Sequence, residues 1–449
     1  MGKFYSSILK RTILPSADKV MNTHIALSYS MIKQMRTWSP DKVQGWQNEK
    51  LSQLLEHSYN HTGYYNEIFN SAGLLPRDIR SIDDLAMLPS LSKETVRKKL
   101  IGLLPDNIRS YPFKKSATGG STGDPLVYYL DNRSWSMSNA NIIVNWENSG
   151  YNYGDKYIAL GSNSLLNNKK ASLKHLVYYG LKNKIALNGV NMSEEVCKDY
   201  ISLIKKNHIC YLYGYASAIY LLAKYVLLQN EDLKIRTCFT TSEVLTSRFR
   251  ETIKKAFQCE ILDCYGANDG GVSAFAKEEG YFEVGYNCLV RVENPDENGN
   301  GPALLTDLFN YSMPLINYKL GDEIRVNTLA NKDNPFNGQI INGIQGRISD
   351  IIHLENGHTI TGPGFTVLFK DLPVEHYFIK KTGINKIECK IVKLPGFSMI
   401  HEETITSTFK KHMGADSLFQ IKYATEITLA KSGKRKYFDG QNSNVVGNF

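Results

Sequence analysis

The chain has 449 residues, of which 42% are hydrophobic and 22% charged, and its formal net charge is +9. This composition is typical of a folded globular protein and excludes disordered, collagen-like and disulfide-rich chains. The lysines and arginines are scattered along the sequence, so we expect small polyanionic substrates, at most peripheral contact with an acidic membrane surface, and no nucleic acid.

The N-terminal part of the chain is expected to be helical. Residues 1–40 have only a weak pattern, typical of loosely packed helix, whereas leucines recur at helical spacing from Trp46 onward. Residues 64–69 predict another short helix. The segment 88–93 predicts a turn into a further helix that is capped by Ser92.

Residues 116–125, Ser-Ala-Thr-Gly-Gly-Ser-Thr-Gly-Asp-Pro, form the most distinctive stretch. Its three glycines allow backbone N–H groups to approach an anion, and its hydroxyls add further donors. The β-prone segment 126–130 follows directly, so a loop entering a strand is predicted. Such a loop suits a polyphosphate, but the lysine of the Gly-x-x-x-x-Gly-Lys-Ser/Thr motif is missing, and a flexible surface hairpin is the alternative.

Helices and strands alternate over the next part of the chain. Helices are predicted at 139–147, 193–206, 218–228 and 248–257, and strands at 156–160, 211–213, 237–240 and 260–264. This alternation indicates βαβ units and a parallel sheet. The apolar stretch 211–228 contains Lys224 and several small or hydroxyl residues, so it predicts a buried helix rather than a membrane span.

The pattern changes from about Gly280, where short strands and turns predict a small antiparallel or barrel-like subdomain. The last hundred residues combine predicted strands at 386–392 and 419–423 with a helix at 402–413. We therefore predict an α/β fold with a large N-terminal domain, residues 1–349, and a smaller mobile α+β C-terminal domain, residues 350–449.

Seven cysteines are spread along the chain without a Cys-x-x-Cys pair. This pattern favours reduced thiols in the cytoplasm. A zinc site built from Cys259, Cys264 and Cys288 is the alternative. The first residues are polar and predict no signal peptide, which agrees with a cytoplasmic location.

Three further stretches follow the glycine-rich one in order. Residues 263–269 combine Tyr-Gly with an acidic residue, residues 314–322 end in Gly-Asp, and Gly346-Arg-Ile-Ser-Asp350 precedes Ser432-Gly-Lys434. Together these motifs resemble those of the adenylate-forming superfamily, which contains acyl-CoA synthetases, luciferases and the adenylation domains of peptide synthetases. The resemblance extends from about residue 45 to about 437 and implies the adenylate-forming enzyme fold.

Other segments narrow the resemblance to one branch of that superfamily. The chain is similar to phenylacetate–CoA ligases and to CapK-type proteins of capsule biosynthesis in several short segments. These are residues 64–69, residues 81–85, Leu88-Pro, Lys93 and residues 240–245. The branch implies that a carboxylic acid reacts with Mg-ATP to give an acyl-adenylate and pyrophosphate. The acyl group then passes to coenzyme A, or to an amine or hydroxyl of a nucleotide sugar or glycan.

The resemblance also assigns roles to single residues. It implies that the cradle of the leaving pyrophosphate is formed by Ser116, Thr118, Gly119, Gly120, Ser121, Thr122 and Gly123. It implies that the other nucleotide-binding residues are Ser242, Glu243, Tyr265, Gly266, Asp322 and Arg347. Tyr265 would pack against adenine, Asp322 would accept hydrogen bonds from the ribose hydroxyls, and Arg347 would bind ribose or phosphate.

Lys434 is the implied catalytic residue, a mobile ammonium that reaches the reacting oxygens when the small lobe closes about Asp350. Lys436 is the second candidate. Taken without the resemblance, Tyr265 would be a core tyrosine, Asp322 a turn aspartate, and the segment 431–436 a solvated basic turn.

The chain departs from the family pattern at the metal site. Asp269 stands at the position of the magnesium-binding glutamate but is one methylene shorter, and Asn268 replaces the usual threonine or serine. Asp124 stands where the family often has a lysine. These departures leave open whether magnesium binds here more weakly than in the family. The acyl pocket is expected along residues 213–217 and near Ser242, where small and aromatic residues favour a modest or amphiphilic acid.

These inferences predict an ATP-dependent enzyme that activates a carboxylic acid in capsular polysaccharide or O-antigen biosynthesis. An aryl- or acyl-CoA ligase of the phenylacetate–CoA ligase type is one alternative. A nucleotide-binding protein with weakened catalysis is another. A homodimer is compatible with the sequence.

Overall fold

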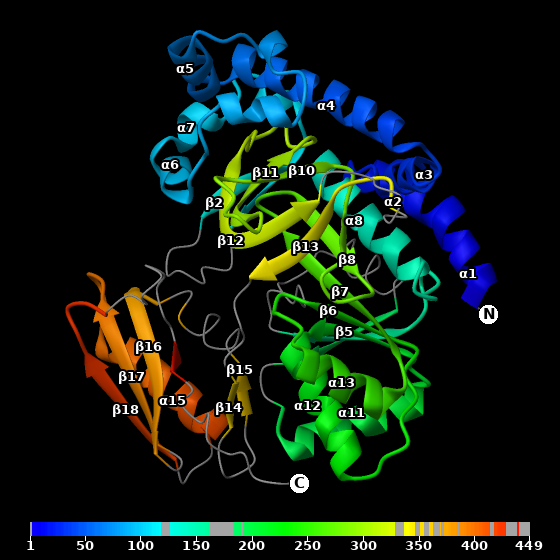
Figure 1. Cartoon of the computed structure of the whole chain (residues 1–449). Helices are drawn as coiled ribbons and strands as arrows, with labels where there is room; N and C mark the ends of the chain where they lie inside the picture. Colours follow the sequence, from blue (N-terminus) through cyan, green and yellow to red (C-terminus); the bar gives the residue numbers. More distant parts are fainter. Residues whose placement is uncertain are drawn as a thin grey trace.

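A large mixed β-sheet organises most of the chain, with helices on both of its faces and a smaller β-rich region beside it (Figure 1). The computed structural model describes residues 2–117, 126–161, 183–189, 192–327, 336–345, 351–353, 359–361, 369, 372–383, 386–413, 417–427 and 438–439. Within these ranges, no helix has both the length and the apolar character that a membrane crossing requires.

Helices account for most of the first hundred residues. They are α1 (Gly2–Ile8), a π-helical turn (Leu9–Ile13), α2 (Leu14–Met21), α3 (Ile25–Met35), α4 (Pro40–His61), α5 (Gly63–Ala72), α6 (Lys93–Lys98) and α7 (Leu100–Leu103). Short 3₁₀ turns lie at Pro76–Asp78, Asp83–Met87 and Ile108–Ser110. Ser92 caps α6 as predicted, accepting a hydrogen bond from the Thr95 N–H at 3.0 Å.

The prediction that residues 1–40 pack loosely is wrong. Ile32 and Met35 are 1% and 0% exposed and belong to the core beneath the sheet. The helical prediction for this segment is confirmed. Burial of one face against the sheet explains why the helices are stable despite their weak sequence pattern.

A hairpin of β1 (Phe113–Ala117) and β2 (Val127–Asp131) flanks the glycine-rich stretch. Helix α8 (Asn132–Glu147) follows β2 directly and begins earlier than the predicted residue 139. The reason is a cap that the apolar pattern does not reveal: the Asp131 carboxylate accepts a hydrogen bond from the Arg133 N–H at 2.8 Å.

The parallel half of the sheet contains the predicted βαβ units. Its strands are β3 (Tyr157–Gly161), β4 (Lys184–Asn188), β5 (Tyr211–Tyr215), β6 (Thr237–Thr241) and β7 (Glu260–Ala267), with helices α11 (Glu194–Asn207), α12 (Ala216–Leu228) and α13 (Ser247–Phe257). Side chains alternate between the two faces: Leu212 and Cys238 lie in the core with α11–α13, whereas Tyr211 and Phe239 pack with α8. Both faces are therefore covered, as expected for parallel strands.

The antiparallel strands continue the same sheet. They are β8 (Val272–Ala276), β9 (Phe282–Val284), β10 (Cys288–Val292), β11 (Asn300–Asp307), β12 (Tyr318–Asn327) and β13 (Ile340–Gln345). The strand order is β10-β11-β12-β13-β9-β8-β7-β6-β5-β3-β4. The predicted β-rich region thus exists, but it joins the parallel sheet through the antiparallel pairing of β7 with β8 rather than forming a sheet of its own.

The C-terminal region has its own sheet and core. A hairpin of β14 (Ile351–His353) and β15 (Thr359–Thr361) precedes β16 (Val374–Gly383), β17 (Lys386–Lys393), α15 (Met399–Met413), β18 (Leu418–Tyr423) and β19 (Phe438–Asp439). The last four strands are ordered β18-β17-β16-β19, and Ile379, Cys389 and Ile405 are fully buried between this sheet and α15. The predicted α+β character is confirmed, while the boundary at 349/350 stays a prediction.

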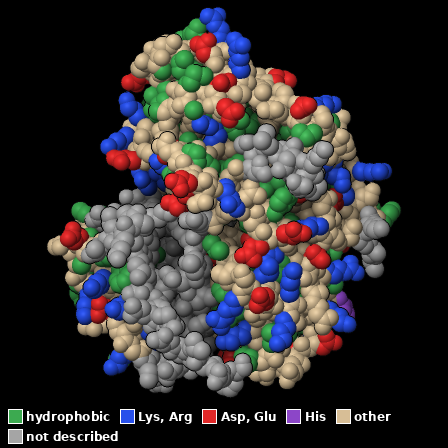
Figure 2. Space-filling model, in the orientation of Figure 1, with side chains coloured by type: hydrophobic (Ala, Val, Ile, Leu, Met, Phe, Trp, Pro, Cys, Tyr) green, Lys and Arg blue, Asp and Glu red, His purple; other side chains and the backbone are tan. Residues whose placement is uncertain are grey.

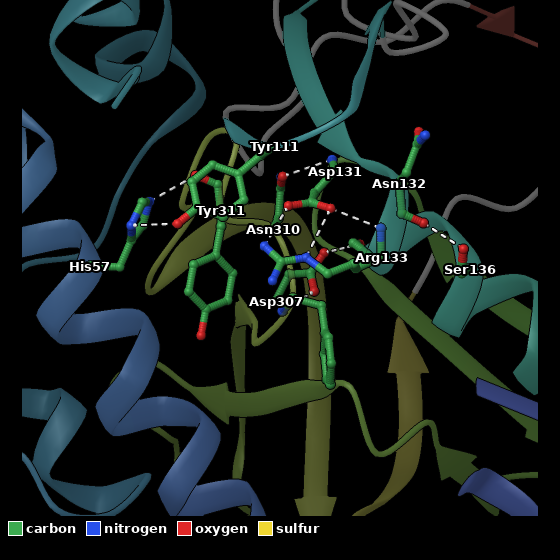
Figure 3. Close-up of polar contacts among 11 residues, drawn as sticks. His57, Tyr111, Asp131, Asn132, Arg133, Ser136, Asp307, Asn310 and Tyr311 are labelled. Atoms are coloured by element: carbon green, nitrogen blue, oxygen red, sulfur yellow. Dashed lines mark hydrogen bonds and ion pairs between the residues drawn. The ribbon is translucent and has the colours of Figure 1, made fainter. Parts of the chain in front are cut away.

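A buried polar network fixes α8 against the helices and strands around it (Figure 3). The fully buried Asp131 accepts an ion-paired hydrogen bond from Arg133 at 2.9 Å, and the guanidinium lies over the rings of Tyr111 and Tyr311. On α4, His57 Nε2 donates to the Tyr311 carbonyl oxygen at 3.0 Å. Helix α4, the start of α8 and the β11–β12 connection therefore share one set of contacts.

Asp307 lies in the same network and provides a test of it. Burial raises the pKa of Asp307 to about 6. Because the folded state holds its proton more tightly than the unfolded chain, the free energy of unfolding should fall as pH rises from about 4 to about 6, by up to about 3 kcal/mol. Asp307→Asn should remove this contribution in denaturant titrations across that range. The exposed Asp232→Asn is the control, and equal pH dependence in wild type and Asp307→Asn would contradict the assignment.

Candidate active site

Two adjoining cavities open at the carboxyl ends of the parallel strands. The first, of about 520 Å³, lies between the ends of β6 and β7 on one side and strands β12 and β13 on the other. The second, of about 390 Å³, lies between α8 and the parallel strands. Both volumes are typical of small-molecule sites, and this edge of an α/β sheet is where ligands usually bind. Tyr265 and Gly266 line both cavities.

Two reciprocal tyrosine–aspartate hydrogen bonds join the walls of this region. Tyr265 on β7 donates to Asp322 Oδ2 on β12 at 3.1 Å, and Tyr318 on β12 donates to Asp269 Oδ2 after β7 at 2.7 Å. In each segment the tyrosine and the aspartate are four residues apart. In the part of the chain that the structure describes, neither carboxylate receives another hydrogen bond. Asp322 lines the first cavity, whereas Asp269 is 7% exposed and lines neither cavity.

The surroundings keep both tyrosines protonated. Burial, and then the Asp322 carboxylate, raise the pKa of Tyr265 well above its usual value. Burial and the Asp269 carboxylate do the same to the pKa of Tyr318. Both phenols therefore stay protonated at physiological pH and donate hydrogen bonds to the two carboxylates.

The hairpin strand before the glycine-rich stretch lies beside Asp269. Ser116 faces Tyr128 across the β1–β2 hairpin and hydrogen-bonds to its hydroxyl. Burial raises the pKa of Tyr128 to about 12, and the nearby charge of Asp269 contributes to that shift. Ser116, the first residue of the predicted phosphate cradle, and Asp269, the predicted metal ligand, thus both act on the Tyr128 hydroxyl.

The residues around Asp269 fit a magnesium ion that takes its remaining coordinating oxygens from a bound small molecule and from water. Asp269 is 7% exposed, and no group of three histidine, cysteine or acidic side chains that could hold a metal is present among the described residues. Magnesium in nucleotide sites usually takes one or two carboxylates and completes its shell with phosphate oxygens and water. The free oxygen of Asp269 can serve as such a carboxylate ligand.

Ser242 and Glu243 line the first cavity, but Glu243 also has a structural partner. Its Oε2 accepts a hydrogen bond from the Ser217 N–H at 2.8 Å, so this carboxylate caps the N-terminus of α12. Ser242 has a left-handed backbone with φ of 69°, an uncommon conformation for serine. Strained positions of this kind cluster at ligand sites.

The second cavity is lined by eight aromatic residues and nearly as many polar ones. Trp135 and Trp146 come from α8 and Tyr213 from β5, while Asn139 and Lys184 add polar groups. Of the predicted acyl-pocket residues 213–217, Tyr213 lines this cavity. Residues 215–217 are buried in the core around α12 and line neither cavity.

Known proteins with sequences similar to this chain agree with the predicted resemblance. No protein-family model matches the chain. It is 24% identical over 401 residues to protein CapK of Staphylococcus aureus, covering 87% of this chain and 88% of that protein. It is 24% identical over 329 residues to the phenylacetate-coenzyme A ligase of Pseudomonas putida, covering 68% and 72%.

Solved structures agree with these relatives. The fold is similar to that of 2-hydroxyisobutyryl-CoA ligase in complex with 2-HIB-AMP and CoA, with a TM-score of 0.57 and 17% identity over 89% of this chain and 90% of that one. The same ligase in its postadenylation state gives a TM-score of 0.53 at 15% identity, over 88% and 89%. Over most of its length the chain is therefore similar to proteins of the adenylate-forming superfamily. The predicted branch of phenylacetate–CoA ligases and CapK, the fold and the ligase class are confirmed.

Several of the residues to which the adenylate-forming family gives roles lie outside the described part of the chain. These are Thr118, Gly119, Gly120, Ser121, Thr122, Gly123, Asp124, Arg347, Asp350, Lys434 and Lys436. Their roles stay predictions. Cys259, one of the three cysteines considered for zinc, contacts Cys238, with their sulfurs 3.6 Å apart, and all seven cysteines are free thiols.

Four charged residues of the first cavity were not predicted as site residues: Lys93, Arg250, Asp263 and Glu279. Lys93 reaches it because Leu91 pairs with β12 through two backbone hydrogen bonds of 2.9 Å, a long-range contact without a local sequence signal. Burial raises the pKa of Asp263 to about 6, although Thr240 donates to its carboxylate at 2.6 Å. The motif around Tyr265 contains Asp263, so its position could have been noted.

The Tyr318–Asp269 bond can be tested through stability. Tyr318→Phe should lower the free energy of unfolding by about 1–3 kcal/mol, because it leaves a buried carboxylate oxygen without a donor. In an Asp269→Asn background, Tyr318→Phe should lower the free energy of unfolding by less, because a neutral amide oxygen forms a weaker hydrogen bond with the phenol than a carboxylate does. Denaturant unfolding of the four proteins gives the coupling energy. Tyr59→Phe, which removes an exposed hydroxyl, is the control, and an equal effect of both tyrosine changes would contradict a stabilising role for the Tyr318 hydroxyl.

Proposed function

We propose that this chain activates a carboxylic acid with ATP as an acyl-adenylate and transfers the acyl group to a thiol, amine or hydroxyl acceptor. The observation that supports this most strongly is the hydrogen bond between Tyr265 and Asp322 in a cavity of about 520 Å³ at the end of β7. An aromatic ring beside a fixed carboxylate suits an adenine base and the two hydroxyls of its ribose. The names of the ligase relatives support the same reaction class.

In the first half-reaction, a carboxylate oxygen of the acid attacks the α-phosphorus of ATP, the bond from that phosphorus to the bridging oxygen breaks, and pyrophosphate leaves. Asp322 would hold the ribose through its free oxygen, and Ser116 with residues 118–123 would donate hydrogen bonds to the phosphates. Asp269 would hold magnesium, which supplies positive charge at the phosphate oxygens. Lys434 would neutralise the reacting oxygens, and Arg347 would contact ribose or phosphate.

The second cavity is our candidate for the acid. It shares Ser242 and residues 264–267 with the first cavity, so an acid bound there would direct its carboxylate toward the nucleotide. Its aromatic walls favour a compact acid with an apolar or ring-shaped body. Asn139 and Lys184 would offer hydrogen-bonding partners to an additional polar group on that acid.

In the second half-reaction the acceptor attacks the acyl carbon and AMP leaves. The complex of 2-hydroxyisobutyryl-CoA ligase with CoA supports a thiol acceptor. The match to protein CapK over 88% of its length, together with the resemblance to CapK-type proteins, supports a role in capsular polysaccharide or O-antigen biosynthesis, where an amine or hydroxyl of a sugar is the acceptor. A cytoplasmic location and a homodimer stay predictions.

The direct test is ATP–pyrophosphate exchange with a panel of carboxylic acids. Exchange is expected with at least one acid. Asp322→Asn should reduce it roughly ten- to hundredfold, because a charged hydrogen-bond acceptor for ribose is lost. Lys434→Ala should reduce it about a hundredfold or more, because the charge at the reacting oxygens is lost. Asp232→Asn and Lys431→Ala are the matched controls.

The other outcomes decide between the alternatives. ATP binding that requires Asp322, without exchange for any acid, would favour a nucleotide-binding protein with weakened catalysis. Failure to bind ATP would refute the proposal altogether. If exchange occurs, thioester formation with coenzyme A as the only acceptor would favour an acyl-CoA ligase of catabolism over a sugar-modifying enzyme.

Lys93 provides a separate prediction. Lys93 lines the first cavity together with Asp322, and a cation there would attract the polyphosphate. Lys93→Met should raise the KM for ATP or slow exchange by roughly tenfold or more while leaving the KM for the acid unchanged. Lys98→Met, on the same helix but exposed and paired with Glu94, is the control. Equal kinetics for both variants would exclude Lys93 from nucleotide binding.

A further inference from the structure

The first helices present one continuous exposed face. Helix α1, the π-helical turn and α2 follow one another without a break from Gly2 to Met21. The exposed residues on this helix are Phe4, Ile8, Arg11, Thr12, Ser16, Lys19 and Val20. Their spacing is four, three and one residues and then the same again, with Arg11 and Thr12 in the π-helical turn itself. Residues three and four apart on a helix are neighbours on its surface.

Large apolar side chains are prominent on this face. Phe4 is 76% exposed and Val20 is 62% exposed, and Leu27 at the start of α3 is 70% exposed. The opposite side of the same helices is anchored in the core through Leu9 and Leu14. The exposure is therefore a property of a fixed surface rather than of a detached segment.

The charge of this part of the chain is strongly positive. Residues 2–36 contain Lys3, Lys10, Arg11, Lys19, Lys33 and Arg36 against the single acid Asp18, which gives +5 of the total net charge of +9. Figure 2 shows basic and acidic side chains interspersed over the visible face of the molecule.

The single acid does not reduce the positive field at the surface. Asp18 is buried, and its two oxygens accept hydrogen bonds from the Thr23 hydroxyl at 2.6 Å and the Ala26 N–H at 2.8 Å. Lys10 and Arg36 are paired with Glu147 and Glu283. The exposed charges that remain on these helices, on Arg11, Lys19 and Lys33, are all positive.

We propose that α1, the π-helical turn, α2 and the start of α3 dock on an anionic phospholipid bilayer. Apolar side chains flanked by cations match the boundary between acyl chains and phosphate headgroups, and cations near the surface strengthen binding to anionic lipid. Figure 1 shows α1, in dark blue, at the periphery of the molecule and away from β12 and β13, which form a wall of the first cavity. Docking would therefore leave that cavity accessible. This inference does not depend on the proposed reaction.

The test is co-sedimentation of the full chain with vesicles. Binding is expected to vesicles of phosphatidylcholine with phosphatidylglycerol, to weaken in high salt, and to be much weaker for phosphatidylcholine alone. The double variant Arg11→Glu/Lys19→Glu should bind at least roughly tenfold more weakly, since each cation contributes about fivefold, equivalent to ~1 kcal/mol. Phe4→Ser/Val20→Ser should lower binding by roughly tenfold through lost apolar contact.

Matched variants on other surfaces control for general effects of charge and polarity. Lys198→Glu/Lys254→Glu changes two exposed lysines of α11 and α13, and Met399→Ser/Ile400→Ser changes two exposed apolar residues of α15. Both should bind vesicles like wild type, and thermal unfolding verifies that all variants are folded. Three outcomes would each overturn the proposal. The chain could bind neutral and anionic vesicles equally, or the control variants could lose as much vesicle binding as the test variants. The third is that Phe4 mediates self-association of the chain and no vesicle binding occurs.

Discussion

Two hydrogen bonds between tyrosine and aspartate bring together parts of the sheet that are not neighbours. Strands β7 and β12 are separated in the strand order by β8, β9 and β13, yet Tyr265 contacts Asp322 and Tyr318 contacts Asp269. The sheet must therefore curve until its parallel and antiparallel halves face each other, as the natural twist of strands permits. Burying carboxylates is unfavourable by itself, and the phenol donors offset part of that penalty. The first cavity is the space that this closure encloses.

The polar network around α8 defines the other side of the site. Asp131 ends β2, caps α8 and pairs with Arg133, while its backbone N–H donates to Asn310 at 3.0 Å. Asp307, beside it, accepts from Ser134 on α8 and from the Phe309 N–H. Because one side of the β1–β2 hairpin is fixed in this way and the other lies beside Asp269, the residues that flank the glycine-rich stretch are held relative to β7 and β12.

Much of this arrangement could be predicted from local patterns. The alternation of helices and strands, the cap at Ser92 and the placement of Tyr265 near the end of β7 all follow from residues close together in the sequence. Asp322, in contrast, lies in the middle of β12 rather than at the end of a strand. Long-range pairing could not be predicted: nothing near Lys93 indicates that Leu91 bonds to β12. The packing of the N-terminal helices could not be predicted either, because the π-helical turn shifts the phase of their apolar residues, so Leu9 and Leu14 do not show the regular spacing of an α-helix.

Two glycines near the site differ in whether the fold itself requires a glycine at their position. At Gly271, with φ of 67°, a Cβ atom would lie 2.3 Å from the Asp307 carboxylate, so the fold itself demands glycine there. At Gly266 an added Cβ would meet only the Val272 carbonyl oxygen at 3.4 Å, an ordinary contact, and the backbone is not left-handed. The protein would tolerate a side chain at Gly266, yet the residue is exposed where both cavities meet. A bare backbone there would allow the close approach of a ligand, as the proposed nucleotide lying against Tyr265 would require.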